Sequence, residues 1–384
     1  MKIGIPREIK EGETRVALIP AMVGELVKVD FQVLVENGAG SRAYFSDQEY
    51  QDAGAQIVAD ATSLYQQADV ILKVQPPMFN EVLKAHELDL MRDGVTLIGF
   101  LSPTTNRELV ERFLAKKITA FSMELMPRVT RAQGIDALTS MSTVAGYKAV
   151  LLATQYLGKF FPLLMTAAGT IPPATVLIIG AGVAGLQAIA TAKRLGARVE
   201  AFDTRPAVKE QIESLGARFV EMELPKEAEA AGGYAREMSP EFIKKEMEAI
   251  GSRLPKSDVV ISTALVFGKK PPLLITEEMV KTMREGSVII DLAAEQGGNC
   301  ELTQPGKVVQ KYGVTICGPL NLPASMPVHA SQMYSRNITN LVKHLYQAKD
   351  RQLDFSDEIT RGCCVCRNGE LVSEIVKSAF SRGG

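Results

Sequence analysis

The segment TVLIIGAGVAGLQAIATAKRLGARVEAFDTRP, residues 175–206, decides the fold. A short apolar strand leads into Gly180-Ala181-Gly182-Val183-Ala184-Gly185, which is followed by a helical pattern and a second strand that ends at Asp203. In such a turn the first glycine permits the tight bend, the second leaves room for a pyrophosphate, and the third lets the helix lie close to the strand. The segment therefore predicts a βαβ unit that binds a dinucleotide at the start of its helix. The alternative is a glycine-rich turn with a packing role alone.

Asp203 indicates which dinucleotide is bound. It lies 23 residues after Gly180, where a carboxylate accepts hydrogen bonds from the adenosine ribose hydroxyls. A carboxylate at that position repels a 2′-phosphate, so the sequence favours NAD(H) over NADP(H). Arg205 works against this preference because it can pair with a phosphate, but the acid holds the strand-end position. The residues predicted to line the cofactor here are Gly180, Gly182, Val183, Gly185, Asp203, Thr204 and Arg205.

The rest of the chain repeats this alternation of strands and helices. At 384 residues it is long for a single hydrophobic core, so we expect two domains. Short β-rich runs alternate with helical patterns from residue 2 to about 125, and again from residue 175 to about 318. Such alternation is typical of parallel sheets covered by helices on both faces. We therefore predict an α/β protein with two Rossmann-like, doubly wound subdomains, a cleft between them and long helices that join them.

The boundaries of the subdomains follow from one long helix and from the tail. A helical pattern at about 142–161 bridges the two alternating regions, and the tail holds a helix at 332–349 followed by CCVCRNGELV. Asn368-Gly369 between β-like runs predicts a tight hairpin, and we expect the tail to pack on the first region. The predicted domains are residues 1–140 with 325–384, and residues 141–324.

Composition and charge exclude several classes of protein. The formal net charge is −1, from 43 basic and 44 acidic residues, which gives no electrostatic basis for binding nucleic acid. No segment resembles a signal peptide, and the most hydrophobic one, residues 149–170, is interrupted by Gln155, Lys159 and Pro162, so we expect no membrane span. The five cysteines lack a second ligand pair at zinc spacing. We expect reduced thiols rather than a redox or metal role, and no metal.

Beyond this fingerprint, long stretches of the sequence resemble known proteins. The opening MKIGIPREIKEGETRVALIP is similar to two related families, alanine dehydrogenase and the NAD(H)-binding component of proton-translocating nicotinamide nucleotide transhydrogenase. Four further segments resemble the transhydrogenase component: ELMPRVTRAQGIDALTSMSTVAGYKAV, MTAAGTIPPATVLIIGAGVAGLQAIATAKRLGA, EAAGGYAREM and GSVIIDLAAEQGGNCELT. The resemblance covers essentially the whole chain.

This resemblance implies a function and a set of partners. NAD(H) binds to the second subdomain, the chain forms a homodimer, and separate chains supply an NADP(H)-binding domain and a membrane domain that conducts protons. Hydride passes directly between the nicotinamides of NADH and NADP⁺, and proton translocation is coupled to that transfer. The chain is then expected to be cytoplasmic and to lie at the cytoplasmic face of the membrane through its partners.

The resemblance also assigns roles to the polar junction RVTRAQGIDALTS, residues 128–140. Arg128, Gln133 and Asp136 match the family loop that holds the nicotinamide end of NAD(H), and they are the predicted catalytic residues. An amide such as that of Gln133 offers both a donor and an acceptor to a carboxamide. Thr139 is predicted to line the cofactor. The alternative is a set of polar helix caps, in which Asp136 and Thr139 cap the helix that follows.

Two further segments complete the predicted cofactor site. The polar stretch 223–254 contains Gly232-Gly233-Tyr234 and matches the family's mobile loop, so Tyr234 is expected to fold over bound nucleotide. The alternative is an exposed surface excursion. Thr263, Ala264 and Leu265 follow a predicted strand at the carboxyl edge of the second sheet, where such folds bind nucleotides. They could equally be a plain strand exit.

Chemistry separates the two related families. Oxidation of alanine moves a proton as well as a hydride and needs a general acid or base. In alanine dehydrogenase a His and an Asp stand where this chain has Ser102 and Glu295. Arg15 and Lys73, which match that family's carboxylate-binding positions, remain. We predict hydride exchange between nicotinamides, and the alternatives are an alanine-dehydrogenase-like oxidoreductase and a regulatory NADH-binding module.

Overall fold

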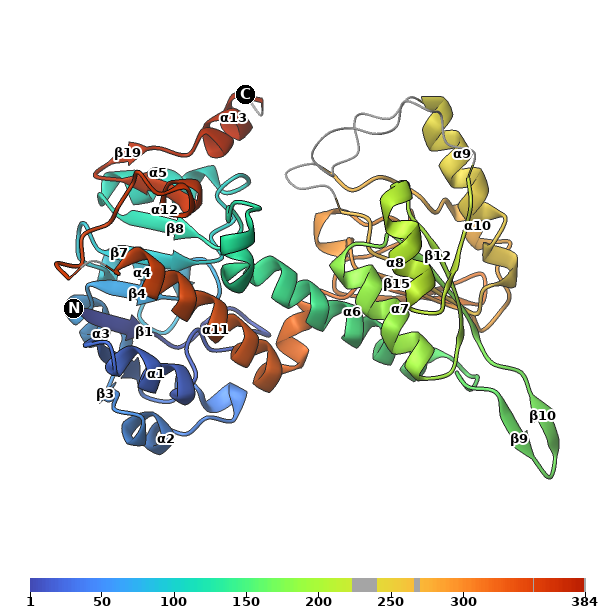
Figure 1. Cartoon of the computed structure of the whole chain (residues 1–384), viewed down its shortest axis with the longest axis horizontal. Helices are drawn as coiled ribbons and strands as arrows, with labels where there is room; N and C mark the ends of the chain where they lie inside the picture. Colours follow the sequence, from blue (N-terminus) through green and yellow to red (C-terminus); the bar gives the residue numbers. More distant parts are fainter. Residues whose placement is uncertain (223–239, 266–269, 348, 383–384) are drawn as a thin grey trace. The chain divides into compact units, whose positions relative to one another are not determined.

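The computed structural model describes residues 1–222, 240–265, 270–347 and 349–382 (Figure 1). The chain divides into two compact units, one made of Met1–Met141 together with Pro323–Gly384 and the other of Ser142–Leu322. The helix α6 (Ala137–Tyr156) begins in the first unit and ends in the second. The second unit is thus an insertion between the two segments of the first.

The described part of the first unit is built on a mixed sheet of eight strands. They are β1 Lys2–Ile5, β2 Gln32–Glu36, β3 Gln56–Val58, β4 Val70–Leu72, β7 Thr96–Gly99, β8 Thr119–Ser122, β18 Cys364–Arg367 and β19 Glu370–Leu371. Their order is β19-β18-β8-β7-β4-β1-β2-β3. Neighbours from β8 to β3 are parallel, whereas β18 runs antiparallel to β8 and β19 antiparallel to β18.

Helices connect these strands and pack on the sheet (Figure 1). They are α1 Pro20–Val27, α2 Asp47–Asp52, α3 Ala61–Gln67, α4 Glu87–Leu90, α5 Arg107–Ala115, α11 Pro327–Leu345, α12 Glu358–Cys363 and α13 Glu374–Arg382. A small hairpin of β5 (Phe79–Asn80) and β6 (Ala85–His86) precedes α4. Several helices begin at a side chain that accepts a backbone N–H of the first turn, as Ser46 does for α2 and Asp60 for α3.

The C-terminal tail completes the first unit. On α11 the Tyr334 hydroxyl donates to the carbonyl of Lys73 at 2.7 Å. The hairpin that Asn368-Gly369 predicts joins β18 to β19, and both residues have positive φ angles, 51° and 83°, as a type I′ turn requires. The tail therefore adds its two strands to the sheet that the N-terminal residues begin.

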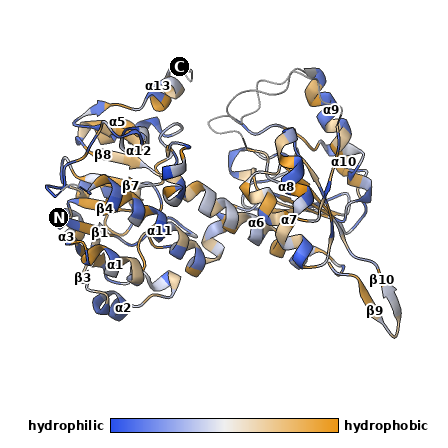
Figure 2. Cartoon of the chain, in the orientation of Figure 1, coloured by the Kyte–Doolittle hydropathy of each residue, from blue (hydrophilic) through white to orange (hydrophobic). Residues whose placement is uncertain are grey.

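The second unit contains a seven-stranded sheet within its described residues. Its strands are β11 Thr175–Ile179, β12 Arg198–Phe202, β13 Arg218–Phe219, β14 Val259–Ser262, β15 Val288–Asp291, β16 Val308–Lys311 and β17 Val314–Cys317. The order is β13-β12-β11-β14-β15-β17-β16, and the pairs are parallel except at the edge strand β16. The connecting helices are α7 Val183–Arg194, α8 Lys209–Ser214, α9 Pro240–Gly251 and α10 Glu277–Val280. Figure 2 shows hydrophobic strands inside each unit, in agreement with their burial.

Both sheets reverse their strand order at one point. In the first sheet the chain runs outward through β1, β2 and β3, and β4 then returns to the other side of β1. In the second sheet β14 returns in the same way to the other side of β11. Ligands of open α/β sheets bind beyond the carboxyl ends of the strands at such a reversal. The candidate positions are therefore the segments after β1 and β4, and those after β11 and β14.

The predicted fold class is confirmed by these two parallel-dominated sheets, but the most apolar stretch differs from expectation. The sequence predicted a helix to about residue 161 followed by a loop. Instead α6 ends at Tyr156, and a hairpin of β9 (Leu164–Thr166) and β10 (Gly169–Ile171) follows. Pro162 cannot continue a helix, and strands of three residues are too short to show an alternating pattern. Within the described residues, no helix has both the length and the apolar character needed to cross a membrane.

Candidate functional site

The glycine-rich turn between β11 and α7 has no room for side chains at two of its positions. A Cβ added to Gly185 would stand 1.9 Å from the Gly180 carbonyl oxygen, and one added to Gly180 would stand 2.8 Å from the Thr263 hydroxyl oxygen. Gly180 also takes a φ of +89°, which L residues rarely adopt. Around the Cβ position of Gly182, by contrast, no heavy atom of the described residues lies within 4 Å. The turn is tight toward the protein and open toward a ligand.

The open side of this turn is the start of α7. Gly182 is the N-cap residue of the helix, and both Gly182 and Val183 are exposed. The first turn of a helix directs N–H groups and a partial positive charge outward, which suits a pyrophosphate. On its other flank α7 packs tightly against α6, because a Cβ at Gly146 would lie 2.1 Å from the Ala184 carbonyl oxygen. The sequence analysis missed this role of Gly146.

Asp203 lies at the end of β12, next to the turn. Its side chain is 6% exposed, and its carboxylate accepts the Ala181 N–H at 2.7 Å. Arg205 supplies three more bonds, from its backbone N–H at 2.8 Å and from Nε and Nη2, both at 2.9 Å. Thr204 between them is half-buried. On α9, burial and then the charge of Asp203 raise the pKa of Glu246 to about 7.

The exit of β14 lies beside the same turn. The Thr263 hydroxyl donates to the Gly180 carbonyl at 3.0 Å. Ala264 exchanges two bonds with the Asn299 amide, its N–H donating to Oδ1 at 3.2 Å and its carbonyl accepting from Nδ2 at 2.9 Å. Leu265 follows and is 48% exposed. This strand exit is therefore a fixed wall next to the glycine-rich turn.

Sequence analysis missed the two residues that hold this wall. The Asn299 amide also donates to the Pro272 carbonyl at 2.9 Å, and its backbone N–H donates to the Asp291 carboxylate at 2.8 Å. Asp291 is fully buried at the end of β15. The available signal was the Gly297-Gly298-Asn299 run after a predicted strand, because both glycines take positive φ angles here, 114° and 86°.

The predicted cofactor residues of the second unit therefore come together at the carboxyl ends of β11, β12 and β14. They are Gly180, Gly182, Val183, Gly185, Asp203, Thr204, Arg205, Thr263, Ala264 and Leu265. Their arrangement fits a dinucleotide, since an open helix start suits the pyrophosphate and a neighbouring carboxylate suits the ribose. Tyr234 lies outside the described residues.

The junction residues belong to the first unit and form a 3₁₀ turn, Thr130–Ile135, before α6. Asp136 caps α6, because its carboxylate accepts the Thr139 N–H at 2.9 Å and the Thr139 hydroxyl at 2.6 Å. Arg128 and Gln133 are exposed. Among the residues that the structure describes, the Gln133 amide makes no hydrogen bond. Asp136 thus shapes the junction, and the Gln133 amide is available to a ligand.

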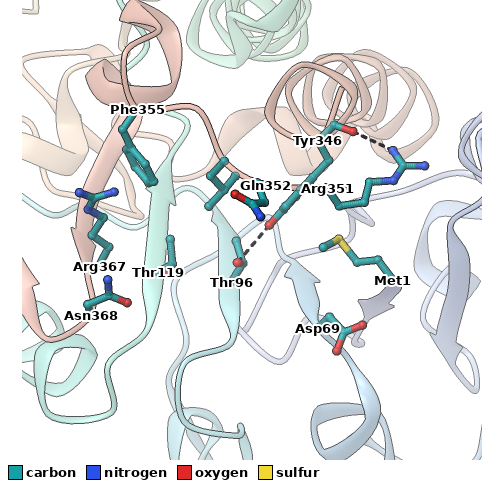
Figure 3. A pocket seen from close by; sticks show the side chains of 11 residues that line it. Met1, Asp69, Thr96, Thr119, Tyr346, Arg351, Gln352, Phe355, Arg367 and Asn368 are labelled. Atoms are coloured by element: carbon teal, nitrogen blue, oxygen red, sulfur yellow. Dashed lines mark hydrogen bonds between the residues drawn. The ribbon is translucent and has the colours of Figure 1, made fainter. Parts of the chain in front are cut away.

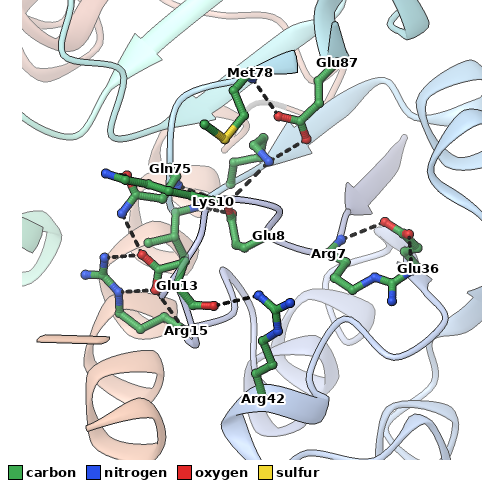
Figure 4. A network of polar contacts seen from close by, with 12 residues as sticks. Arg7, Glu8, Lys10, Glu13, Arg15, Glu36, Arg42, Gln75, Met78 and Glu87 are labelled. Carbon is green, nitrogen blue, oxygen red and sulfur yellow. Dashed lines mark hydrogen bonds and ion pairs between the residues drawn. The ribbon is translucent and has the colours of Figure 1, made fainter. Parts of the chain in front are cut away.

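At the reversal of the first sheet, the segments after β1 and β4 carry a buried cluster of charges (Figure 4). Lys73 is fully buried, and its ammonium nitrogen lies 2.7 Å from Glu87 and 3.4 Å from Glu8. The Tyr65 hydroxyl donates to Glu87 at 2.6 Å. Burial alone would lower the pKa of Lys73, but the two carboxylates outweigh burial and hold that pKa above its ordinary value.

Arg15 is held in the same cluster. Its Nε and Nη2 donate to the two oxygens of Glu13 at 2.8 and 2.7 Å, and the side-chain exposures are 3% and 0%. The Gln75 amide donates to the same carboxylate at 2.6 Å. This is a bidentate pair that satisfies both charged groups. The chain's own side chains thus fill the position where the first sheet would bind a ligand.

A cavity of about 390 Å³ opens at the other edge of the first sheet (Figure 3). Met1, Asp69, Thr96 and Thr119 line it, and they lie at or just before the amino ends of β1, β4, β7 and β8. The Tyr346 hydroxyl in its wall already donates to Thr96 at 3.1 Å. Because α/β folds bind ligands at the carboxyl edge, we assign the site to the glycine-rich turn instead.

The cysteine cluster has no metal-binding geometry. Among the described residues, no group of three or more His, Cys, Asp or Glu side chains is placed to hold a metal ion. Cys363, Cys364 and Cys366 are buried thiols. Burial raises the pKa of Cys364 and Cys366 to about 12, so both are protonated and unreactive at neutral pH.

Comparison with known proteins places the whole chain. Two family models match it, "Alanine dehydrogenase/PNT, N-terminal domain" over residues 4–145 and "Alanine dehydrogenase/PNT, C-terminal domain" over residues 149–374. The chain belongs to the alanine dehydrogenase/PNT family. Members of both branches are similar to it over most of their length.

In the transhydrogenase branch, an NAD(P) transhydrogenase subunit alpha chain of Rhodospirillum rubrum is 50% identical over 376 residues, which cover 97% of this chain and 98% of that protein. The crystal structure of transhydrogenase from Sinorhizobium meliloti has a TM-score of 0.87 and 39% identity, and the match covers 97% of this chain and 100% of that one. Alanine dehydrogenase 2 of Staphylococcus aureus is 32% identical over 335 residues, 85% of this chain and 82% of that protein. The alanine dehydrogenase/PNT match makes this chain an oxidoreductase with an NAD-binding, Rossmann-like fold.

Within the alanine dehydrogenase/PNT family, the general acid or base for alanine oxidation is the remaining question. Ser102 and Glu295, at the positions compared above, are both exposed. His86 caps α4, and His344 pairs with Asp357 at 2.8 Å. Both histidines belong to the first unit, whereas the glycine-rich turn belongs to the second. The structure assigns these two histidines to structural contacts.

Replacing Glu87 by Gln should destabilise the first unit. The change leaves the buried Lys73 ammonium with Glu8 as its one carboxylate partner, and removing one partner of a buried ion pair costs about 3–5 kcal/mol. Urea unfolding followed by circular dichroism measures the loss. Glu81→Gln is the matched control, because Glu81 is 79% exposed and its pairing with Lys84 is worth at most about 1 kcal/mol. Equal stability of the two variants would contradict a tightly coupled cluster.

The second unit should lose stability as the pH rises from about 5 to about 7. The pKa of Glu246 is about 7 in the folded chain, above its ordinary value of 4.5, so the folded state retains a proton that the unfolded state has lost. That stabilisation is fully present below 4.5 and is lost as the pH passes the folded value. Glu246→Gln should flatten this dependence and raise Tm at pH 8 by about 3 °C. Glu248→Gln, at a 65% exposed position of α9, is the control, and an unchanged pH slope in Glu246→Gln would refute the assignment.

Proposed function

We propose that this chain is the NAD(H)-binding subunit of a proton-translocating nicotinamide nucleotide transhydrogenase. In this role it binds NADH at the glycine-rich turn, and hydride passes directly to NADP⁺ on an NADP(H)-binding partner domain. The observation that carries the proposal is a contrast between the two sheet reversals. The second is open for a dinucleotide, and the first is filled by Lys73, Arg15 and their carboxylates.

The filled reversal argues against alanine oxidation. A substrate such as alanine or pyruvate needs a cation for its carboxylate. Arg15 and Lys73 are buried and already bonded to Glu13 and Glu87. An incoming carboxylate would leave one of these glutamates buried and unpaired, at a cost of about 3–5 kcal/mol. Exchange between two nicotinamides needs no such cation, and the higher identity to the transhydrogenase relative, 50% against 32%, supports the same choice.

The chain contributes position rather than acid–base chemistry. Bound NADH supplies the hydride, and transfer to a second nicotinamide moves no proton on the protein side. The start of α7 binds the pyrophosphate, and Asp203 accepts the ribose hydroxyls. Gln133 holds the carboxamide with one donor and one acceptor. Orientation of the two reacting carbons at about 3–3.5 Å then provides most of the rate.

The other predicted residues support this placement. Asp136 fixes the junction by capping α6, Thr139 completes that cap, and Arg128 binds the pyrophosphate or ribose. Tyr234, which lies outside the described residues, covers the bound nucleotide. Separate chains supply the NADP(H) site and the membrane domain that conducts protons. Through them this chain lies at the cytoplasmic face of the membrane, where hydride transfer is coupled to proton translocation.

The chain also forms a homodimer in this proposal, and the hairpin of β9 and β10 supports it. In the described part of the chain these two strands pair only with each other, and an isolated two-stranded hairpin is marginal in water. Phe160, Leu163 and Met165 are nevertheless 54%, 53% and 81% exposed, and Figure 2 shows β9 as hydrophobic. A second copy offers the same apolar surface, so a two-fold pairing buries both hairpins.

Nucleotide exchange tests the proposed function. The chain, mixed with an NADP(H)-binding domain of a transhydrogenase and supplied with NADH and NADP⁺, should form NADPH. With NAD⁺ and L-alanine alone it should form no NADH. The opposite pair of results would establish an alanine dehydrogenase, and NADH binding with neither reaction would establish a regulatory module.

Gln133→Asn should separate positioning from binding in that assay. A shorter amide at position 133 loses the reach to the carboxamide, so hydride exchange should fall by a factor of about 10² while the NADH Kd changes little. Arg131→Gln, at a 65% exposed position of the same junction, is the control. Exchange at the wild-type rate in Gln133→Asn would remove Gln133 from the mechanism.

Met165→Asp should convert the proposed dimer to a monomer. The substitution places a charge in a surface that pairing would bury, which costs several kcal/mol unless the charge finds a partner. Sedimentation equilibrium measures the mass directly. Thr170→Asp, at an exposed polar position of β10, is the control for the hairpin itself. A monomeric wild-type chain, or a Met165→Asp variant that stays dimeric, would contradict the role of this hairpin.

A further inference from the structure

The carboxylate of Asp203 is already saturated by the chain itself. A carboxylate has about four lone-pair sites on its two oxygens. Oδ1 accepts the Arg205 N–H at 2.8 Å and Nε at 2.9 Å, and Oδ2 accepts the Ala181 N–H at 2.7 Å and Arg205 Nη2 at 2.9 Å. All four sites are therefore filled. A ribose can bond to this carboxylate only if one or more of these donors leaves.

The four donors differ in their freedom to leave. Two are backbone N–H groups, one in the glycine-rich turn at Ala181 and one at Arg205 beside the strand end, and both are held by the path of the chain. The other two belong to the Arg205 guanidinium, whose side chain is 40% exposed and can swing into solvent. Its departure would open one site on Oδ1 and one on Oδ2. Those are the two sites that the neighbouring hydroxyls of a ribose use as a pair of donors.

We propose that Arg205 is an internal competitor for the ribose-binding carboxylate and the residue that sets the discrimination between NADH and NADPH. The guanidinium fork and the 2′,3′-diol are both two-pronged donors, and they exclude each other on Asp203. NADH displaces the fork with its two hydroxyls. NADPH carries a phosphate in place of the 2′-hydroxyl, so it cannot supply both donors and instead attracts the cation. This inference rests on the proposed binding of NAD(H) at the glycine-rich turn.

Removal of the fork should therefore shift the two affinities in opposite directions. In Arg205→Gln the carboxylate sites are open before binding, so NADH and AMP should bind about threefold to tenfold more tightly. NADPH should bind more weakly, because it loses a cation and faces an uncompensated carboxylate. The gain should be much smaller for 2′-deoxy-AMP, which has no diol. Arg205→Lys, with a single point charge in place of the fork, should lie between Gln and the wild type.

Isothermal titration with NADH, NADPH, AMP and 2′-deoxy-AMP measures these shifts. Arg218→Gln is the matched control, because Arg218 is 73% exposed on the neighbouring strand and approaches Glu200 only at 3.8 Å. A gain for NADH that requires the diol, with a loss for NADPH, supports the inference. Weaker or unchanged NADH binding in Arg205→Gln overturns it, as does an equal gain for 2′-deoxy-AMP. If the wild-type chain fails to bind NADH at all, the proposed function falls instead, so the two failures are distinguishable.

Discussion

The crossing of α7 between β11 and α6 is the constraint on which the nucleotide site depends. Side chains are impossible on both flanks of its first turn, because a Cβ at Gly185 or Gly146 would stand 1.9 or 2.1 Å from a backbone oxygen. Close contact on two sides fixes where the helix begins, and with it the direction of the N–H groups that would meet a pyrophosphate. Asp203 completes the arrangement by binding the Ala181 N–H from the end of β12. Backbone packing therefore places the site before any ligand arrives.

The two sheets share a topology but use their reversal points differently. In the second, Gly182 leaves the approach to the helix open. In the first, Glu8, Glu87 and Lys73 occupy the equivalent region and are almost fully buried. Replacing such buried ion pairs by apolar groups is often neutral or stabilising, so stability alone does not explain their retention. On the proposed function they have a second effect, because a reversal point filled by bonded charges rejects small anionic substrates and leaves one ligand site per chain.

The elements of the fold that sequence predicts are those with a local signature. The strand, Gly180 to Gly185, the helix and Asp203 lie within one βαβ unit, so their spacing alone carries the information. Gly146 and Asn299 lack such a signature, because each acts through a partner that is 38 and 35 residues away in the chain, Ala184 and Ala264. The hairpin at 164–171 was missed because apolar residues there face outward, against the usual rule that such residues are buried. Long-range contact and exposed apolar surface are the two properties that periodicity does not show.

The pairing of Arg205 with Asp203 shows the same limit and also explains itself physically. Sequence gives the two charges but not the rotamer, and it suggested a phosphate as the partner of the arginine. A carboxylate that is 6% exposed cannot remain without compensation, since an unpaired buried charge costs several kcal/mol. When no ribose is bound, the nearest cation must supply that compensation, and a bidentate guanidinium does so with two bonds at 2.9 Å. The burial that makes Asp203 a strong ribose acceptor is thus the same burial that requires Arg205 beside it.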